Sequence, residues 1–177
     1  MPTEPRIDQL PLELVTMSCR YLDICSLMNL MDTCRRFRYY MLTSTSLWRR
    51  IVIDLKYGTI TEIYAALRRL KDSNGLRFLV QEVIMDHTDD SMLSPIVMLV
   101  KFPHLKYLSA RYRSSNTDLG ADAKVLQEHL NCGTFQPQSL ALKRLNIYHY
   151  NMSSETYFEN PESTLAEPGA IGLLAVL

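Results

Sequence analysis

The sequence predicts a protein of α+β to α/β class, with a helical N-terminal segment followed by alternating strands and helices. Two observations predict this. Residues 10–50 place apolar side chains at helical spacing between helix-start signals, and residues 51–150 repeat one short apolar strand pattern with helix-like segments between the copies. Residues 1–9 are expected to form a flexible N-terminus, and residues 151–177 a polar tail with an apolar C-terminal end.

Three to four short helices are expected in the N-terminal segment. Pro11 suits the first turn of the first helix, because a proline there removes no intrahelical hydrogen bond. Asp23 is a candidate N-cap for a second helix, Asp32 or Thr33 for a third, and Ser46 for a final turn.

The first of these helices is apolar on more of its circumference than one buried stripe requires. Its two neighbouring apolar rows are Val15, Cys19 and Leu22, and Leu14, Met17 and Tyr21. A segment of this size also buries too little surface to be stable alone. The helices are therefore expected to pack on the rest of the chain or on a partner protein, and periodicity leaves both open.

In order and spacing, residues 10–50 resemble an F-box. The matching elements are Leu10-Pro11-Leu12-Glu13, Tyr21-Leu22-Asp23, Leu27 with Leu30, Cys34-Arg35-Arg36-Phe37 and Leu47-Trp48-Arg49. The resemblance covers a little over a quarter of the chain. It implies binding to an adaptor of the Skp family and, through that adaptor, to a cullin. The adaptor-binding residues it implies, as contacts or as framework, are Leu10, Pro11, Leu14, Val15, Leu22, Leu27, Leu30, Phe37, Leu47 and Trp48.

Beyond residue 50 the chain repeats one spacing, which is similar to the strand motif of leucine-rich repeats. The three copies are Val80-x-x-Val83-x-Met85, Leu105-x-x-Leu108-x-Ala110 and Leu142-x-x-Leu145-x-Ile147, and an earlier unit begins at Ile51-Val52-Ile53-Asp54-Leu55. The expected helices are Thr59 to Leu70, with a capping box in Thr59 and Glu62, Ser91 to Val100, and Asp122 to Leu130, with a stop at Gly133. The predicted fold is a short, incomplete leucine-rich-repeat solenoid with parallel strands. The alternative is an irregular α/β domain whose strands share this spacing.

Alternation along each strand predicts which side chains face the core. Those expected inside are Val83, Met85, Leu108, Ala110, Leu145 and Ile147. The intervening residues are expected on a concave surface that binds a target protein. The substrate-binding candidates are Glu82, Asp86, Tyr107, Ser109, Arg111, Arg144, Asn146 and Tyr148, with Asp54 and Ile84 on the same face.

Composition excludes several classes of function. The chain has 19 Lys and Arg against 19 Asp and Glu, so no excess of positive charge indicates nucleic acid or an anionic membrane as a partner. The N-terminus lacks a secretory signal pattern, and the expected location is cytoplasmic and/or nuclear. The four cysteines and four histidines show no metal-binding or disulfide spacing, and Asp86-His87 is interpreted as part of a loop. We therefore expect no metal, no cofactor and no catalytic site.

The predicted function is recognition without bond chemistry. The resemblance implies the substrate-recognition subunit of a Skp–cullin–F-box ubiquitin ligase, with the adaptor held by residues 10–50 and a target protein by residues 51–150. The alternatives are an F-box scaffold or assembly protein that acts outside a cullin ligase, and a small hydrolase, which no nucleophile–base pair in the sequence supports. The chain is expected to be a fragment or short form of a longer receptor, or to use its last apolar residues as a cap.

Overall fold

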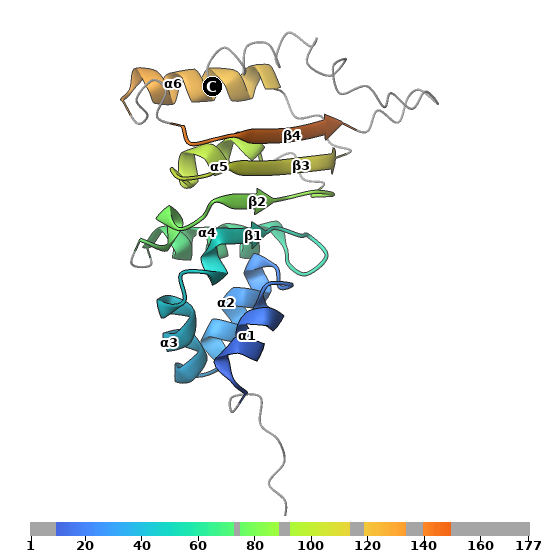
Figure 1. Ribbon diagram of the computed structural model, residues 1–177. Helices are drawn as coiled ribbons and strands as arrows, with labels where there is room; N and C mark the ends of the chain where they lie inside the picture. The colour runs from blue at the N-terminus through green and yellow to red at the C-terminus, as the bar shows by residue number, and fades with distance from the viewer. Residues whose placement is uncertain (1–9, 73–74, 89–92, 114–118, 134–139, 150–177) are drawn as a thin grey trace, which may run out of the picture.

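The computed structural model describes residues 10–72, 75–88, 93–113, 119–133 and 140–149. Three short helices gather next to β1, at one edge of a four-stranded sheet, and a helix follows each of the first three strands (Figure 1). The elements are α1 (Leu12–Cys19), α2 (Ile24–Thr33), α3 (Arg35–Thr43), η2 (Leu47–Arg49), β1 (Arg50–Val52), α4 (Ile60–Asp72), η3 (Leu76–Phe78), β2 (Glu82–Ile84), α5 (Pro95–Lys101), β3 (Tyr107–Arg113), α6 (Leu119–Asn131) and β4 (Arg144–His149). The predicted segments 1–9 and 151–177 lie outside the described residues.

The start of α2 confirms the expected cap. The Asp23 carboxylate accepts hydrogen bonds from the backbone N–H groups of Cys25 and Ser26, at 2.8 and 3.2 Å. These N–H groups have no partner within the helix, so the carboxylate stabilises its first turn. Pro11 lies one residue earlier than expected, at the N-cap of α1, and Ser46 precedes η2 without a side-chain capping bond.

The predicted cap of α3 is wrong. Neither Asp32 nor Thr33 caps this helix, because the thiol of Cys34 accepts the hydrogen bond from the backbone N–H of Phe37 at 3.5 Å. The hydroxyl of Thr33 instead donates to the carbonyl of Leu30 at 2.7 Å, and the Asp32 carboxylate binds arginines of other elements.

The four strands are parallel and lie in chain order, β1-β2-β3-β4. Their register places Val83, Leu108 and Leu145 side by side, which are the corresponding positions of the three predicted repeat copies, and Ile51 of β1 lies beside Val83. Parallel strands and the predicted alignment are therefore confirmed. The assignment of these units to a leucine-rich-repeat solenoid stays a prediction.

The helices between the strands differ from expectation mainly at their ends. At α4 the capping box is confirmed: Glu62 Oε2 accepts from the Thr59 backbone N–H at 2.7 Å, and Thr59 Oγ1 accepts from the Glu62 N–H at 3.3 Å. Helix α5 begins at Pro95 rather than Ser91, with Ser94 as its cap, and Ser91 lies outside the described residues. After α6 ends at Asn131, Gly133 has a φ of 72°, as expected at a helix stop.

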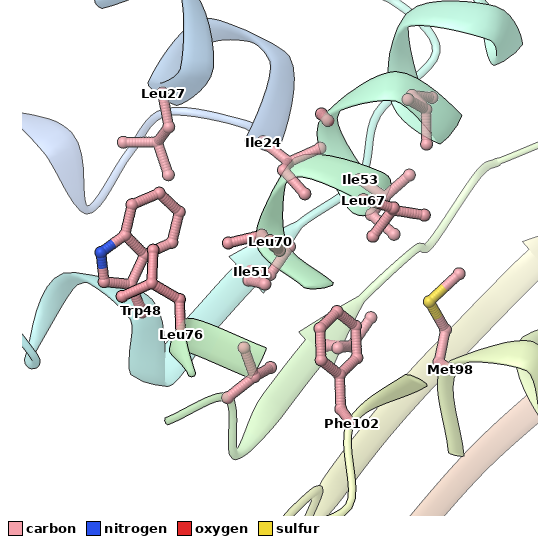
Figure 2. Packing of buried hydrophobic residues seen from close by; sticks show 14 of the residues in the cluster. Ile24, Leu27, Trp48, Ile51, Ile53, Leu67, Leu70, Leu76, Met98 and Phe102 are labelled. Atoms are coloured by element: carbon pink, nitrogen blue, oxygen red, sulfur yellow. The ribbon is translucent and has the colours of Figure 1, made fainter. Parts of the chain in front are cut away.

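One continuous core joins the N-terminal helices to the sheet. Trp48 is completely buried, and its indole N–H donates to the carbonyl of Met41 at 2.6 Å. In Figure 2 its ring lies in the same packed cluster as Leu27, Ile51 and Leu70. The N-terminal helices therefore bury one of their apolar faces against the rest of the chain.

Candidate protein-interaction surfaces

Helix α1 keeps a second apolar face exposed. We call this face the α1 stripe; it consists of Leu14 and Met17 in the helix, with Leu10 and Tyr21 at the same helical spacing just before and after it. The exposed fractions of Leu14, Met17 and Tyr21 are 49%, 58% and 88%, whereas Val15 and Cys19, on the neighbouring row, are buried. An exposed cluster of large apolar side chains on one helix is typical of a surface that binds another protein.

The opposite side of α1 is fixed to α3. The hydroxyl of Tyr40 donates to the carbonyl of Leu12 at 3.2 Å and is also hydrogen-bonded to the hydroxyl of Thr16. The Arg36 guanidinium donates to the carbonyl of Leu10 at 3.4 Å. Helix α3 therefore holds α1 in place, with the stripe turned toward solvent.

The predicted adaptor-binding residues separate into an exposed, a half-buried and a buried set. Leu10, Pro11 and Leu14 are exposed, and Leu22 and Leu30 are half-buried. The buried set consists of Val15, Leu27, Phe37, Leu47 and Trp48. The side chains of the buried set lie in the core of the chain.

The predicted residues omitted two exposed members of the stripe, Met17 and Tyr21. The helical spacing of Leu14, Met17 and Tyr21 is the sequence signal that identifies them. Leu12 is also exposed, but it is two positions from both Leu10 and Leu14 and therefore lies on another side of the helix.

The second candidate surface is the face of the sheet turned away from its helices. The predicted strand phase is confirmed where it is best tested, because Val83, Met85, Leu108 and Ala110 are completely buried. Leu145 and Ile147 are only half-buried, contrary to expectation. They belong to β4, which has no strand on its outer side within the described residues.

An ion pair joins Asp86, just beyond the C-terminal end of β2, to Arg111 of β3. Asp86 accepts from Arg111 Nε and Nη2 at 2.9 and 2.7 Å, and from Ser109 Oγ at 2.6 Å. Burial raises the pKa of Asp86, but the hydrogen bonds from Arg111 and Ser109 outweigh burial and leave it below its ordinary value. Contrary to the expectation of an exposed position, Ser109 is 1% exposed, because its small side chain lies between the neighbouring strand residues Ile84 and Asn146.

The other candidate residues make contacts between neighbouring strands. The Arg144 guanidinium lies 5.7 Å from the centre of the Tyr107 ring, and Asn146 Nδ2 donates to the Tyr107 hydroxyl at 3.0 Å. Arg50 Nε lies 3.8 Å from Glu82 Oε2. Asp54 and Ile84 are half-buried. Tyr148 pairs with Arg111 in the backbone register, and its side chain lies outside the described residues.

Sequence reasoning missed a ring pair at the ends of β2 and β3. The rings of His87 and Tyr112 are stacked, with centroids 4.8 Å apart and planes 13° from parallel. Both residues have a left-handed φ, 57° and 58°, which is uncommon outside glycine. They are separated by 25 residues, the same offset as Val83 and Leu108, and this offset is the signal that could have found them.

The thiols and acidic groups in the described part of the chain form no metal centre. No group of three or more His, Cys, Asp or Glu that could hold a metal ion occurs among the described residues. Burial, together with the charges of Asp23 and Glu62, raises the pKa of Cys25 to about 11, so its thiol stays protonated at neutral pH. Within the same residues, every helix is too short or too polar to cross a membrane.

Comparison with known proteins supports the N-terminal assignment. The F-box-like family model matches residues 7–54, a range that contains the whole α1 stripe and ends just beyond β1. No curated protein and no solved structure matched the chain. The chain therefore contains an F-box-like domain at residues 7–54, which indicates a role in F-box-mediated protein interaction.

Proposed function

We propose that this chain is the substrate-recognition subunit of a Skp–cullin–F-box ubiquitin ligase. The α1 stripe of its F-box-like domain binds a Skp-family adaptor, and the sheet region binds a target protein. The chain itself is not an enzyme. It acts by proximity, because holding a target near the conjugating enzyme raises the effective concentration of the reacting groups.

The observation that carries this proposal is the division of α1 into a covered and an uncovered apolar face. The chain already buries Val15 and Cys19 against its own core, and it leaves Leu14, Met17 and Tyr21 in solvent. F-box domains typically bind Skp-type adaptors, so the adaptor is the partner that suits the uncovered face. The parallel strands, stacked in the predicted register, support a repeat region with a binding face beside it.

The test is co-expression with a Skp-family adaptor. We expect the full chain to be poorly soluble alone and soluble with the adaptor, because the stripe is then covered. Leu14→Asp and Met17→Asp should each abolish co-purification, since they place a charge in an apolar contact. Val125→Asp is the matched control, because Val125 is an exposed apolar residue on α6, 42% exposed.

The control must leave co-purification unchanged, and all three variants must keep the thermal melting curve of the parent chain. Equal solubility of the chain with and without adaptor, or co-purification of both stripe variants, would overturn adaptor binding through α1. Recruitment of a cullin by the purified pair separates a ligase subunit from an F-box scaffold that acts outside a ligase.

A further inference from the structure

The starts of the four strands bring together cationic residues that are far apart in the sequence. Backbone hydrogen bonds run from Gln81 N to Arg49 O, from Lys106 N to Gln81 O and from Lys143 N to Lys106 O, at 2.8–2.9 Å. The next row pairs Arg50, Glu82, Tyr107 and Arg144 by strand register. We call these two rows the strand-start edge; in Figure 1 it lies at the tails of the four arrows.

Five of these eight residues are Lys or Arg, and one is a carboxylate. All five cations are exposed: Arg49, Arg50, Lys106, Lys143 and Arg144. The whole chain carries equal numbers of basic and acidic residues, so the fold has concentrated positive charge at this edge. The opposite ends of the first two strands instead lead to Asp54 and Asp86.

Among the described residues, the contacts between side chains leave most of this charge uncompensated. Glu82 lies 3.8 Å from Arg50, Lys106 Nζ donates to the neutral Gln81 at 3.1 Å, and Arg144 faces the Tyr107 ring. Such an edge attracts an anionic partner. The attraction acts at short range, because salt screens the interaction between exposed charges.

We propose that the strand-start edge binds a short acidic peptide segment of the target protein. This inference rests on the proposed function, because it assigns the chemistry of the target. Three steps between neighbouring strands span about 14 Å, which an extended peptide covers with roughly four to five residues. Nucleic acid suits the edge less well, because proteins that bind DNA commonly contact about 6–10 phosphates along a longer path. The Gln81 amide and the lysine ammonium groups supply hydrogen-bond donors for carboxylates.

The test measures binding of fluorescein-labelled hexaglutamate to the full chain, co-purified with its adaptor, by fluorescence anisotropy. Hexaglutamate should bind, and hexaglutamine should not. Lys106→Glu combined with Lys143→Glu should weaken binding at least about tenfold, because two ion contacts become repulsive. Lys56→Glu combined with Lys124→Glu is the matched control, since it makes the same change in total charge at two other exposed lysines. It should bind the peptide as the parent does.

Equal loss in the control pair, or no loss in the edge variant, would overturn the inference. Tighter, Lys106- and Lys143-dependent binding of hexathymidylate or of phosphatidylserine vesicles would overturn it as well, in favour of nucleic acid or membrane. Adaptor co-purification should be unchanged in the edge variant. If the adaptor co-purifies with the parent chain but hexaglutamate does not bind, this inference alone fails. If the adaptor does not co-purify and the full chain purified alone still binds hexaglutamate, the proposed function alone fails.

Discussion

Asp32 at the end of α2 accepts two hydrogen bonds from the Arg69 guanidinium of α4, at 2.7 and 2.9 Å. The pair joins the F-box-like domain to the first strand–helix unit across 37 residues of sequence. Arg38 donates to the same carboxylate at 3.2 Å, so two arginines from different helices share one acidic group. The pKa of Asp32 is lowered, chiefly by the hydrogen bond from Arg69.

Asp32→Asn should cost less than about 1 kcal/mol of unfolding free energy, because the side chains of the Arg69–Asp32 pair are 40% and 46% exposed, so water screens their attraction. Solvent screens exposed pairs, so the cost should shrink further in high salt. Urea unfolding at low and high salt measures both effects. A salt-independent cost above about 2 kcal/mol would mean that this carboxylate is far less hydrated than its exposure indicates.

Asp86→Asn should cost more, roughly 1.5–3 kcal/mol, because the Asp86 side chain is 12% exposed and its loss leaves Arg111 without its charged partner. The folded-state pKa of Asp86 lies below its ordinary value of 3.8. Its contribution is therefore present above pH 3.8 and is lost as the pH falls through the folded-state value. The difference in unfolding free energy between parent and variant should be constant near neutral pH and shrink in acid, as urea titrations at several pH values would show. A difference that grows toward low pH would contradict this assignment.

Local signals predicted much of this fold, and the errors have both local and distant causes. The cap at Asp23 and the capping box at Thr59 depend on neighbours within three residues, and both were correct. The cap of α3 was wrong because α2 continues through Asp32 and Thr33, which leaves Cys34 as the residue that caps α3, and cysteine is not a usual capping residue. The face of each strand followed from alternation, whereas the burial of Ser109 depends on which strands lie beside it.

For the candidate sites too, local sequence signals predict one part and the folded structure shows the rest. Helical spacing separates the two rows of α1, but only the packed structure shows that the chain covers the row of Val15 and exposes the row of Leu14. The strand-start edge was not predicted, because its cations are brought together by a register that joins residues 49, 106 and 143.

Adjacent residues of β3 should respond oppositely to truncation. Leu108 is completely buried, so Leu108→Ala should cost roughly 2–5 kcal/mol through lost burial and a cavity. Tyr107 points to the other face, so Tyr107→Ala should cost much less and leave adaptor binding intact. Thermal melts of the two variants side by side check the strand phase. If the tyrosine variant is the less stable one, the phase is wrong.

Trp48→Ala should destabilise the core that connects the N-terminal helices to the sheet, because Trp48 is buried and makes no surface contact. Large aromatic truncations in a core cost about 3–5 kcal/mol, and this one also leaves the carbonyl of Met41 without its hydrogen bond. Trp48→Phe keeps most of the volume and should cost less. Under conditions in which Trp48→Phe is folded, its affinity for the adaptor should equal that of the parent. A folded Trp48→Phe variant that no longer binds would make Trp48 a direct contact.

Gly58 lies in the loop between β1 and α4 and comes against Cys25 of α2. A Cβ added at residue 58 would lie 2.9 Å from the Cys25 sulfur and 3.3 Å from the Cys25 Cβ. The first distance is too short for an unstrained contact, and Cys25 is buried, so its side chain has little room to move. Glycine at this position is therefore required by the close approach of the loop to the F-box-like domain.

Gly58→Ala should cost about 1–3 kcal/mol, the usual range for overpacking a dense core. Cys25→Ala removes the sulfur and with it the shorter of the two contacts. The double variant should then be more stable than the sum of the two single costs allows, by at least about 0.5 kcal/mol. The measurement is a double-mutant cycle, which uses the unfolding free energies of the parent, both single variants and the double variant. The cycle subtracts the effect of each single substitution. Additive costs would show that the loss at residue 58 comes from the backbone of the loop and not from its contact with Cys25.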